Sequence, residues 1–198
     1  MARLGQSRRA TVQKRTERAP PKPLDARKLD ELALAYVARF ATSRGKLSAY
    51  LTRKLRERGW DGEGDPPVAA LVERMSEFGY VDDAAFARAK SGSLLRRGYG
   101  ARRVADALGA DGIDGALRAQ VAPGEGDQRR AALALARKRR FGPFGAGAAD
   151  RTVREKQIAA MLRAGHRLDS IRALFAAPDI AEAEAWAYGA DEAEEQAE

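Results

Sequence analysis

A helical motif recurs three times along the chain at almost equal spacing. Two apolar residues and a glycine, each four positions apart, occur as Leu51, Leu55 and Gly59 and again as Val104, Leu108 and Gly112. A third copy starts at Ile158, continues through Met161 and Leu162, and ends at Gly165. The copies start 53 and 54 residues apart. Such regular spacing predicts tandem modules, although any amphipathic helix that ends at a glycine carries the same local pattern.

The residues around each motif predict two further helices in each module. Apolar residues at helical spacing run from Leu29 to Phe40 and from Val68 to Phe78, with Asp65 as the expected cap of the latter helix and Pro66 in its first turn. In the second module, Asp82 or Asp83 can cap a helix that holds Phe86 and Leu95, and Ile113 to Val121 mark a short one. In the third, helices are expected through Leu133 and from Ile171 to Phe175.

The fold class we expect is therefore all-α, with tandem three-helix repeats in three modules. Three helices of this size bury only a small core, so stacked modules should form an elongated, curved molecule. The expected organisation is a disordered basic N-terminal arm (1–27), three repeats (28–80, 81–123 and 124–178) and an acidic C-terminal tail (179–198). The arm is rich in proline and lacks apolar periodicity. The tail holds eight acidic residues and Trp186, and it can either dock on a basic surface or stay solvated.

The composition indicates the cellular compartment in which the protein works. The chain contains no cysteine, which fits a reducing compartment and leaves no thiolate nucleophile or cysteine-based zinc site. No apolar run of about 18 residues occurs, and no apolar segment follows the basic start as it would in a secretory signal. We expect a cytoplasmic protein, monomeric and without a membrane contact.

The sequence offers little for catalysis. The single histidine, His166, follows Gly165 at an expected helix end, and no serine or acid is spaced to form a triad with it. Asp82 and Asp83 are better explained as helix caps than as paired carboxylates, because adjacent side chains on a helix diverge. Gly98-Tyr99-Gly100 lacks the third glycine of a dinucleotide-binding loop. We expect no enzyme activity and no cofactor.

Basic residues concentrate in the middle of the chain, where residues 84–140 hold thirteen Lys and Arg against five acids. Such a surface attracts polyanions, and an exposed tyrosine among arginines can stack on a base or anchor a protein. The alternative is that the arginines are merely solvated and that Tyr99 packs within its own module. The candidate binding residues for a partner or DNA are Arg88, Lys90, Arg96, Arg97, Tyr99, Arg102, Arg103, Lys138, Arg139 and Arg140.

Two strings in this region carry a family resemblance. They are Phe78-Gly79-Tyr80-Val81-Asp82-Asp83-x-x-Phe86-Ala87 and Arg97-Gly98-Tyr99-Gly100-x-x-Arg103-Val104-x3-Leu108-x3-Gly112-Ile113. Together with Tyr50 to Gly59 upstream and Met161 to Gly165 downstream, they resemble the RecX family over about residues 30 to 176. The resemblance implies an elongated row of three-helix repeats that lies in the groove of the RecA filament on single-stranded DNA. It also implies that the protein acts by occupancy, as an inhibitor that limits the ATPase, strand-exchange and coprotease activities of RecA.

A second functional hypothesis is a stand-alone helical-repeat protein that binds DNA without RecA. The basic middle and the basic arm favour it. It predicts an affinity for DNA that falls steeply as the salt concentration rises.

Overall fold

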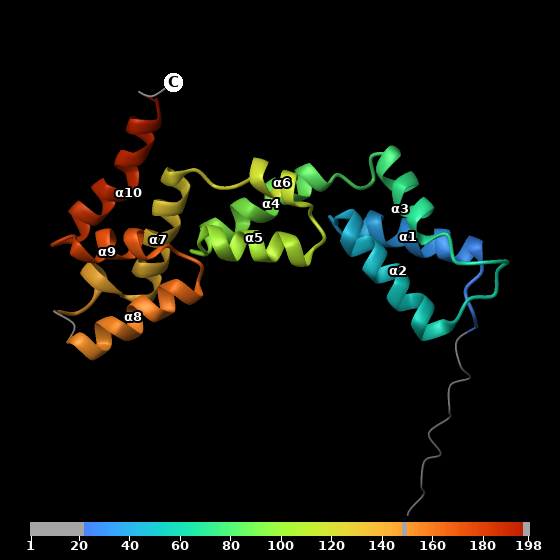
Figure 1. Cartoon of the computed structure of the whole chain (residues 1–198), viewed down its shortest axis with the longest axis horizontal. Helices are drawn as coiled ribbons and strands as arrows, with labels where there is room; N and C mark the ends of the chain where they lie inside the picture. The colour runs from blue at the N-terminus through green and yellow to red at the C-terminus, as the bar shows by residue number, and fades with distance from the viewer. Residues whose placement is uncertain (1–21, 148–149, 196–198) are drawn as a thin grey trace, which may run out of the picture.

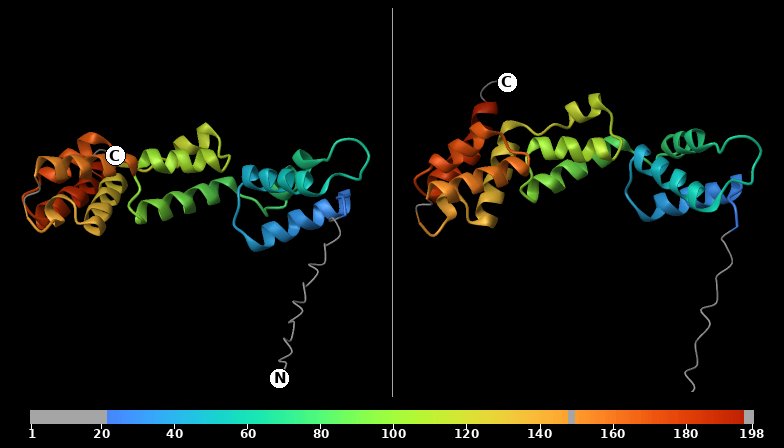
Figure 2. Two further views of the ribbon diagram at one scale, coloured as in Figure 1. Left: turned by 90° about the horizontal axis from the view of Figure 1, so that it is seen from below. Right: turned by 60° about the horizontal axis from the view of Figure 1, so that its bottom comes forward.

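The computed structural model describes residues 22–147 and 150–195, and this part of the chain forms ten α-helices and one short 3-10 helix. The helices follow one another in an elongated row of three small bodies (Figures 1 and 2). Each body has its own cluster of buried apolar side chains. The all-α, elongated fold expected from the sequence is confirmed. Among the described helices, none combines the length and the apolar character that crossing a bilayer requires.

The first module contains α1 (Ala26–Arg39), α2 (Arg44–Arg58) and α3 (Val68–Glu77). The carboxylate of Asp25 caps α1 by accepting a hydrogen bond from the backbone N–H of Lys28 at 2.8 Å. The expected capping of α3 by Asp65 is wrong, because the helix starts only at Val68 after Pro67 and has no side-chain cap. Each of two consecutive prolines disfavours helical geometry in the residue before it, which keeps Asp65 and Pro66 out of the helix.

The fold begins earlier than the predicted end of the N-terminal arm at residue 27. Leu24 is fully buried in the core of the first module. Its N–H donates to the carbonyl of Gly59 at 3.0 Å, and its carbonyl accepts from the N–H of Asp61 at 2.8 Å. Residues from Leu24 onward therefore belong to the first module. Residues 1–21, which make up most of the predicted arm, lie outside the described residues.

The central module contains α4 (Asp83–Arg96), α5 (Ala101–Ala110) and α6 (Gly115–Gln120) around Ala87, Val104, Leu108 and Ile113. Of the two candidate caps, Asp82 is the one that caps α4, since its carboxylate accepts from the N–H of Ala85 at 2.9 Å. Asp83 instead accepts from the N–H of Arg44 at 2.8 Å, at the start of α2. The two adjacent carboxylates thus serve a helix start and a contact between modules.

The third module holds one α-helix and one short 3-10 helix more than expected. It contains α7 (Glu125–Arg139), the 3-10 helix η1 (Gly142–Phe144), α8 (Arg151–Arg163), α9 (Leu168–Ala176) and α10 (Ile180–Glu195). The predicted acidic tail forms α10, which packs along α7 with Ala183 and Ala187 fully buried. Arg137 pairs with Glu184, and the guanidinium of Arg129 lies 5.4 Å from the ring centroid of Trp186. Residues 180–189 of the predicted tail therefore dock on α7, and the side chains from residue 190 onward lie outside the described part of the structure.

The three glycines of the repeated motif share a positive φ and lie at the end of the motif helix in each module. Gly59, Gly112 and Gly165 follow α2, α5 and α8 with φ of 82°, 79° and 95°. These values lie in the left-handed region, where a side chain is disfavoured. The recurrence at residue intervals of 53 thus reflects a repeated structural unit.

Successive modules are joined where the end of one motif helix meets the start of another. At the first junction, the Ser43 hydroxyl at the N-cap of α2 donates to the carbonyl of Asp111 after α5, at 2.5 Å. At the second, the N–H of Gly100 at the N-cap of α5 donates to the carbonyl of Ala164 after α8, at 2.9 Å. The helices α2, α5 and α8 therefore follow one another along one side of the row (Figure 1).

Candidate interface on the central module

A tight turn between α4 and α5 displays most of the predicted basic residues of the central module. We define the junction patch as Arg96, Arg97, Tyr99, Arg102 and Arg103. The turn is made by Gly98, whose φ of 85° suits glycine, and it is closed by hydrogen bonds from Gly98 to Leu95 and from Tyr99 to Leu94. The four arginines are exposed, and Tyr99 is half-buried. The sequence therefore places four cations on about two turns of backbone.

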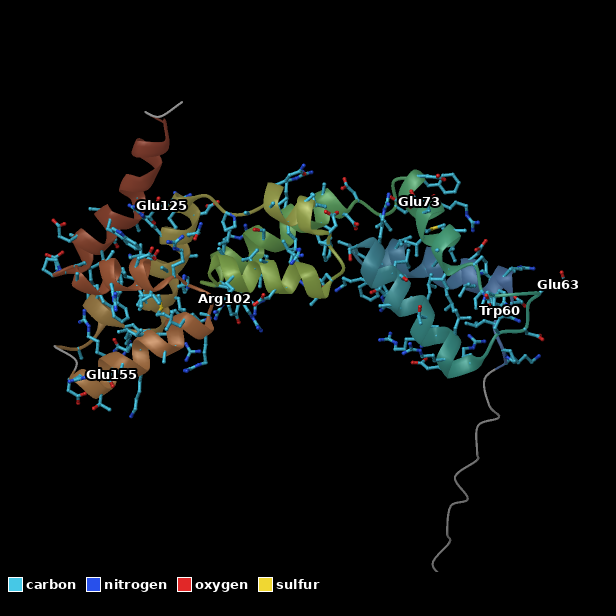
Figure 3. All side chains as sticks on the ribbon, viewed as in Figure 1. Trp60, Glu63, Glu73, Arg102, Glu125 and Glu155 are labelled. Carbon is cyan, nitrogen blue, oxygen red and sulfur yellow. The ribbon has the colours of Figure 1, made fainter. Side chains whose placement is uncertain are left out.

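The junction patch is fixed in place by the third module. A Cβ on Gly100 would lie 2.4 Å from the backbone of Gly165, so the start of α5 and the end of α8 touch through their main chains. The guanidinium of Arg102 donates to the carbonyl of Leu162 at 2.9 Å (Figure 3). Because the approach of Gly100 to Gly165 is a main-chain contact, the orientation of the patch depends on the docking of the third module.

A groove beside the patch continues the positive surface onto the third module. It has a volume of about 770 Å³, and its lining includes Arg102, Arg167 and Arg172. Asp169 also lines it and forms an ion pair with Arg167, which lowers the pKa of Asp169 to about 2 and raises that of Arg167. Asp169 is thus ionised at neutral pH and offsets one of the three cations.

Tyr99 is paired within the patch. The guanidinium carbon of Arg97 lies 5.4 Å from the centroid of its ring, within the range of a cation–π contact. The half-buried Tyr99 ring is therefore in contact with an arginine of the same turn.

Lys90, a predicted binding residue, has a structural role at the other end of the central module. Its ammonium forms an ion pair with Asp111 and lies 5.8 Å from the centroid of the Phe86 ring. Lys46 of the first module approaches the same carboxylate at 3.6 Å. Asp111 thus joins two modules, and the ammonium of Lys90 is paired with its carboxylate. Arg88 is exposed but lines a separate groove between α4 and α6.

Lys138, Arg139 and Arg140, the remaining predicted residues, are exposed at the end of α7. Leu135 of this helix packs against the Gly98 turn, where a glycine Cβ would lie 2.9 Å from that of Leu135. Lys138 and Arg139 follow Leu135 by three and four residues, so they lie on the same side of α7 one turn further on. They extend the positive surface from the junction patch onto the third module.

His166 has a structural position at the second junction. It is buried, and its Nε2 lies 3.0 Å from the carbonyl of Gly98 in the patch turn. Burial lowers its pKa, which favours the neutral ring as the donor in this contact. Across the described residues, no group of three His, Cys, Asp or Glu side chains is arranged to hold a metal ion.

Several residues that build the site escaped sequence reasoning. Ser43, Gly45 and Asp111 make the first junction, where a Cβ on Gly45 would lie 2.6 Å from the Cα of Gly112. A glycine in the first turn of a helix is a signal of close backbone approach, because it weakens the helix without a compensating cap. Gly100 gives no such signal, because it is the N-cap of α5, where glycine is common.

Comparison with known proteins identifies the family. No family model matches the chain. Regulatory protein RecX of Myxococcus xanthus is 32% identical over 163 residues, covering 77% of this chain and 87% of that protein, and that of Stenotrophomonas maltophilia is 39% identical over 123 residues, covering 62% and 72%. The crystal structure of RecX from Lactobacillus salivarius shares the fold, with a TM-score of 0.59 over 74% of this chain and 92% of that chain at 17% identity. The chain belongs to the RecX family of regulatory proteins.

Proposed function

We propose that this protein binds the RecA filament on single-stranded DNA and inhibits its ATPase, strand-exchange and coprotease activities. The observation that carries the proposal is the junction patch, a set of four exposed arginines held rigidly between two modules of an elongated body. A guanidinium can pair in a fork with phosphates or with carboxylates, so one patch can contact both components of a nucleoprotein filament.

Inhibition follows from occupancy in this proposal. We expect a body made of three modules in a row to lie across neighbouring subunits of a helical filament, so that every module that docks restricts the movements that ATP turnover requires. Because each module contacts mainly its neighbours, the shape of the row is set by the two junctions. The protein itself then needs no reacting group, in keeping with the structural role of His166.

The experiment measures ATP hydrolysis by RecA on single-stranded DNA against the concentration of this protein. The test variant replaces Arg96, Arg97 and Arg103 with alanine. A matched control replaces Arg27, Arg56 and Arg151, which are exposed arginines on the first and third modules, and so removes the same charge. We expect the wild type and the control to inhibit, and the test variant to need a concentration at least about tenfold higher.

Two results would count against the proposal. The first is unchanged RecA turnover at saturating wild-type protein, together with undecorated filaments in electron micrographs. The second is equal inhibition by the test variant and the control, which would leave RecA as a partner but remove the junction patch as the contact. Tight binding to naked DNA with no effect on RecA would favour the stand-alone DNA-binding hypothesis.

A further inference from the structure

The first module carries a group of three aromatic rings, one of which lies outside its core. We define the aromatic platform as Tyr36, Phe40 and Tyr50. The Tyr36 and Tyr50 rings, from α1 and α2, are stacked with centroids 4.2 Å apart and an interplanar angle of 19°. Phe40 continues the series, with its centroid 5.3 Å from that of Tyr36. The platform therefore bridges the outer surfaces of two helices.

Phe40 is the ring that a purely structural role leaves unexplained. Tyr36 and Tyr50 are partly buried and pack against the core of the first module, whereas Phe40 is 51% exposed and lies outside that cluster. It stands at the C-cap of α1, where its N–H donates to the carbonyl of Tyr36 at 3.0 Å and its extended backbone ends the helix. The ring is thus held at the surface by a fixed piece of main chain.

Cationic side chains surround the platform. The guanidinium of Arg39 lies 5.7 Å from the Phe40 centroid, and Arg53 and Lys54 lie 5.6 and 6.0 Å from the Tyr50 centroid. A shallow groove of about 400 Å³ runs between the rings and is lined by Tyr36, Phe40 and Tyr50 together with Arg39 and Arg53.

One carboxylate lies among these cations. Glu57 forms ion pairs with Lys54 at 2.6 Å and with Arg53 at 3.6 Å, and the Lys54 contact lowers its pKa, so that it is charged at neutral pH. Three cations against one carboxylate still leave a net positive charge beside the rings. The arrangement of flat rings and positive charge matches a single-stranded polynucleotide, whose unstacked bases lie on aromatic faces while its phosphates contact Lys and Arg.

We propose that the aromatic platform is a binding site for unstacked bases of single-stranded DNA, with a base on the exposed Phe40 ring and the adjoining phosphate on Arg39. Duplex DNA does not fit this site, because its bases are already stacked and paired. The site lies on the first module, apart from the junction patch, and it does not depend on RecA being the partner. It would give the protein a hold on DNA on the first module, separated from the third module by the central one.

The test is direct binding of the full chain to a short fluorescent oligothymidylate, measured by anisotropy without RecA. A strand of equal length in which the bases are replaced by abasic sites serves as the second ligand. Phe40→Ala should weaken binding to the intact strand about 5- to 150-fold and leave the salt dependence unchanged, because it removes a stacking contact and no charge. Arg39→Gln should instead lower the slope of log K against log salt by about 1.

The matched control is Leu34→Ala, which removes another exposed apolar side chain from α1, 44% exposed, on a different side of the helix. It should bind the intact strand like the wild type. Glu57→Gln should strengthen binding up to about 5-fold, because it removes the one carboxylate beside the platform. Thermal melting of Phe40→Ala should match that of the control, since neither side chain is buried.

The abasic strand separates stacking from simple charge attraction. The wild type should bind it as weakly as Phe40→Ala binds the intact strand, and Phe40→Ala should not distinguish the two strands. Equal binding of both strands by the wild type, or wild-type affinity in Phe40→Ala, would overturn the proposal. Failure of this protein to slow RecA would sink the proposed function alone, because the anisotropy assay contains no RecA.

Discussion

Replacing Gly100 with alanine is expected to loosen the contact between the central and third modules without unfolding either. Gly100 has φ of −80°, which any residue adopts, so alanine brings no backbone strain. Its Cβ, however, would lie 2.4 Å from the carbonyl carbon and oxygen of Gly165 and 2.6 Å from the nitrogen of His166. All three are main-chain atoms that cannot rotate away, so the end of α8 must withdraw.

The free-energy cost of Gly100→Ala can be estimated from the hydrogen bonds that break when the end of α8 withdraws. The hydrogen bonds at stake are those from Gly100 to Ala164 at 2.9 Å, from Arg102 to Gly165 at 3.3 Å, and between His166 and Gly98 at 3.0 Å. Each contributes roughly 0.5 to 1.5 kcal/mol, whereas tolerating the overlap costs about 1 to 3 kcal/mol. The protein will adopt the cheaper of these alternatives, so we expect a loss of about 1 to 3 kcal/mol in the docking of the third module.

Hydrogen exchange and urea unfolding together test this estimate. The amides of residues 100 and 102 should lose protection while those inside α7 and α9 keep it, and the third module should unfold at a lower urea concentration. Gly109→Ala is the matched control, because Gly109 lies inside α5 and its nearest contact is the flexible end of Arg118 at 3.1 Å. Alanine there should stabilise the helix by about 0.5 to 1 kcal/mol. Unchanged protection at residues 100 and 102 would refute the close backbone packing on which the reasoning rests.

Three further predictions concern single side chains. Leu108→Ala should lower the free energy of unfolding by about 2 to 5 kcal/mol, because Leu108 is 1% exposed at the centre of the core of the central module. Circular dichroism during urea unfolding measures this loss, and an unchanged urea midpoint would contradict the assignment of Leu108 to the core. Asp111→Ala should lower the free energy of unfolding by about 1 to 2 kcal/mol, because it leaves the ammonium groups of Lys46 and Lys90 to repel each other. If this loss of stability does not shrink in high salt, its cause is not electrostatic. Burial lowers the pKa of His166, so the unfolded chain binds a proton at this imidazole more readily than the folded chain does. The free energy of unfolding should therefore fall as the pH drops below about 6.5. His166→Gln should make this dependence on pH weaker, which urea unfolding at several pH values can measure.

The repeat and the motif helices were predictable because their signals are local. An amphipathic stripe followed by a left-handed glycine marks a helix and its end within about fifteen residues, as at Leu51 and Gly59. The Asp82 cap and the Gly98 turn were readable for the same reason. These elements need no knowledge of distant residues, because the backbone conformation and its side-chain cap are neighbours in sequence.

The features that sequence reasoning missed depend on distant partners or on weak apolar signals. The buried face of α10 consists of Ala183 and Ala187, so the acidic residues around them dominated the interpretation. Leu24 stands among prolines, and its place in the core is set by its pairing with Trp60, which is distant in sequence. Lys90 looks like the other basic residues of the middle segment until folding places Asp111, 21 positions away, against its ammonium.

The end-to-end contact of α8 and α5 also decides how the junction patch can bind an anion. A helix N-terminus usually offers free N–H groups and a positive dipole to phosphate. At α5, the N–H groups of Gly100 and Arg102 already donate to the carbonyls of Ala164 and Gly165. Two of the amides at the start of α5 are therefore taken, and we expect phosphate or carboxylate binding at the patch to come from the guanidinium groups. If the remaining main-chain amides were the anion site, opening the junction by Gly100→Ala would strengthen DNA binding. If the guanidinium groups are the site, the same substitution should weaken binding or leave it unchanged.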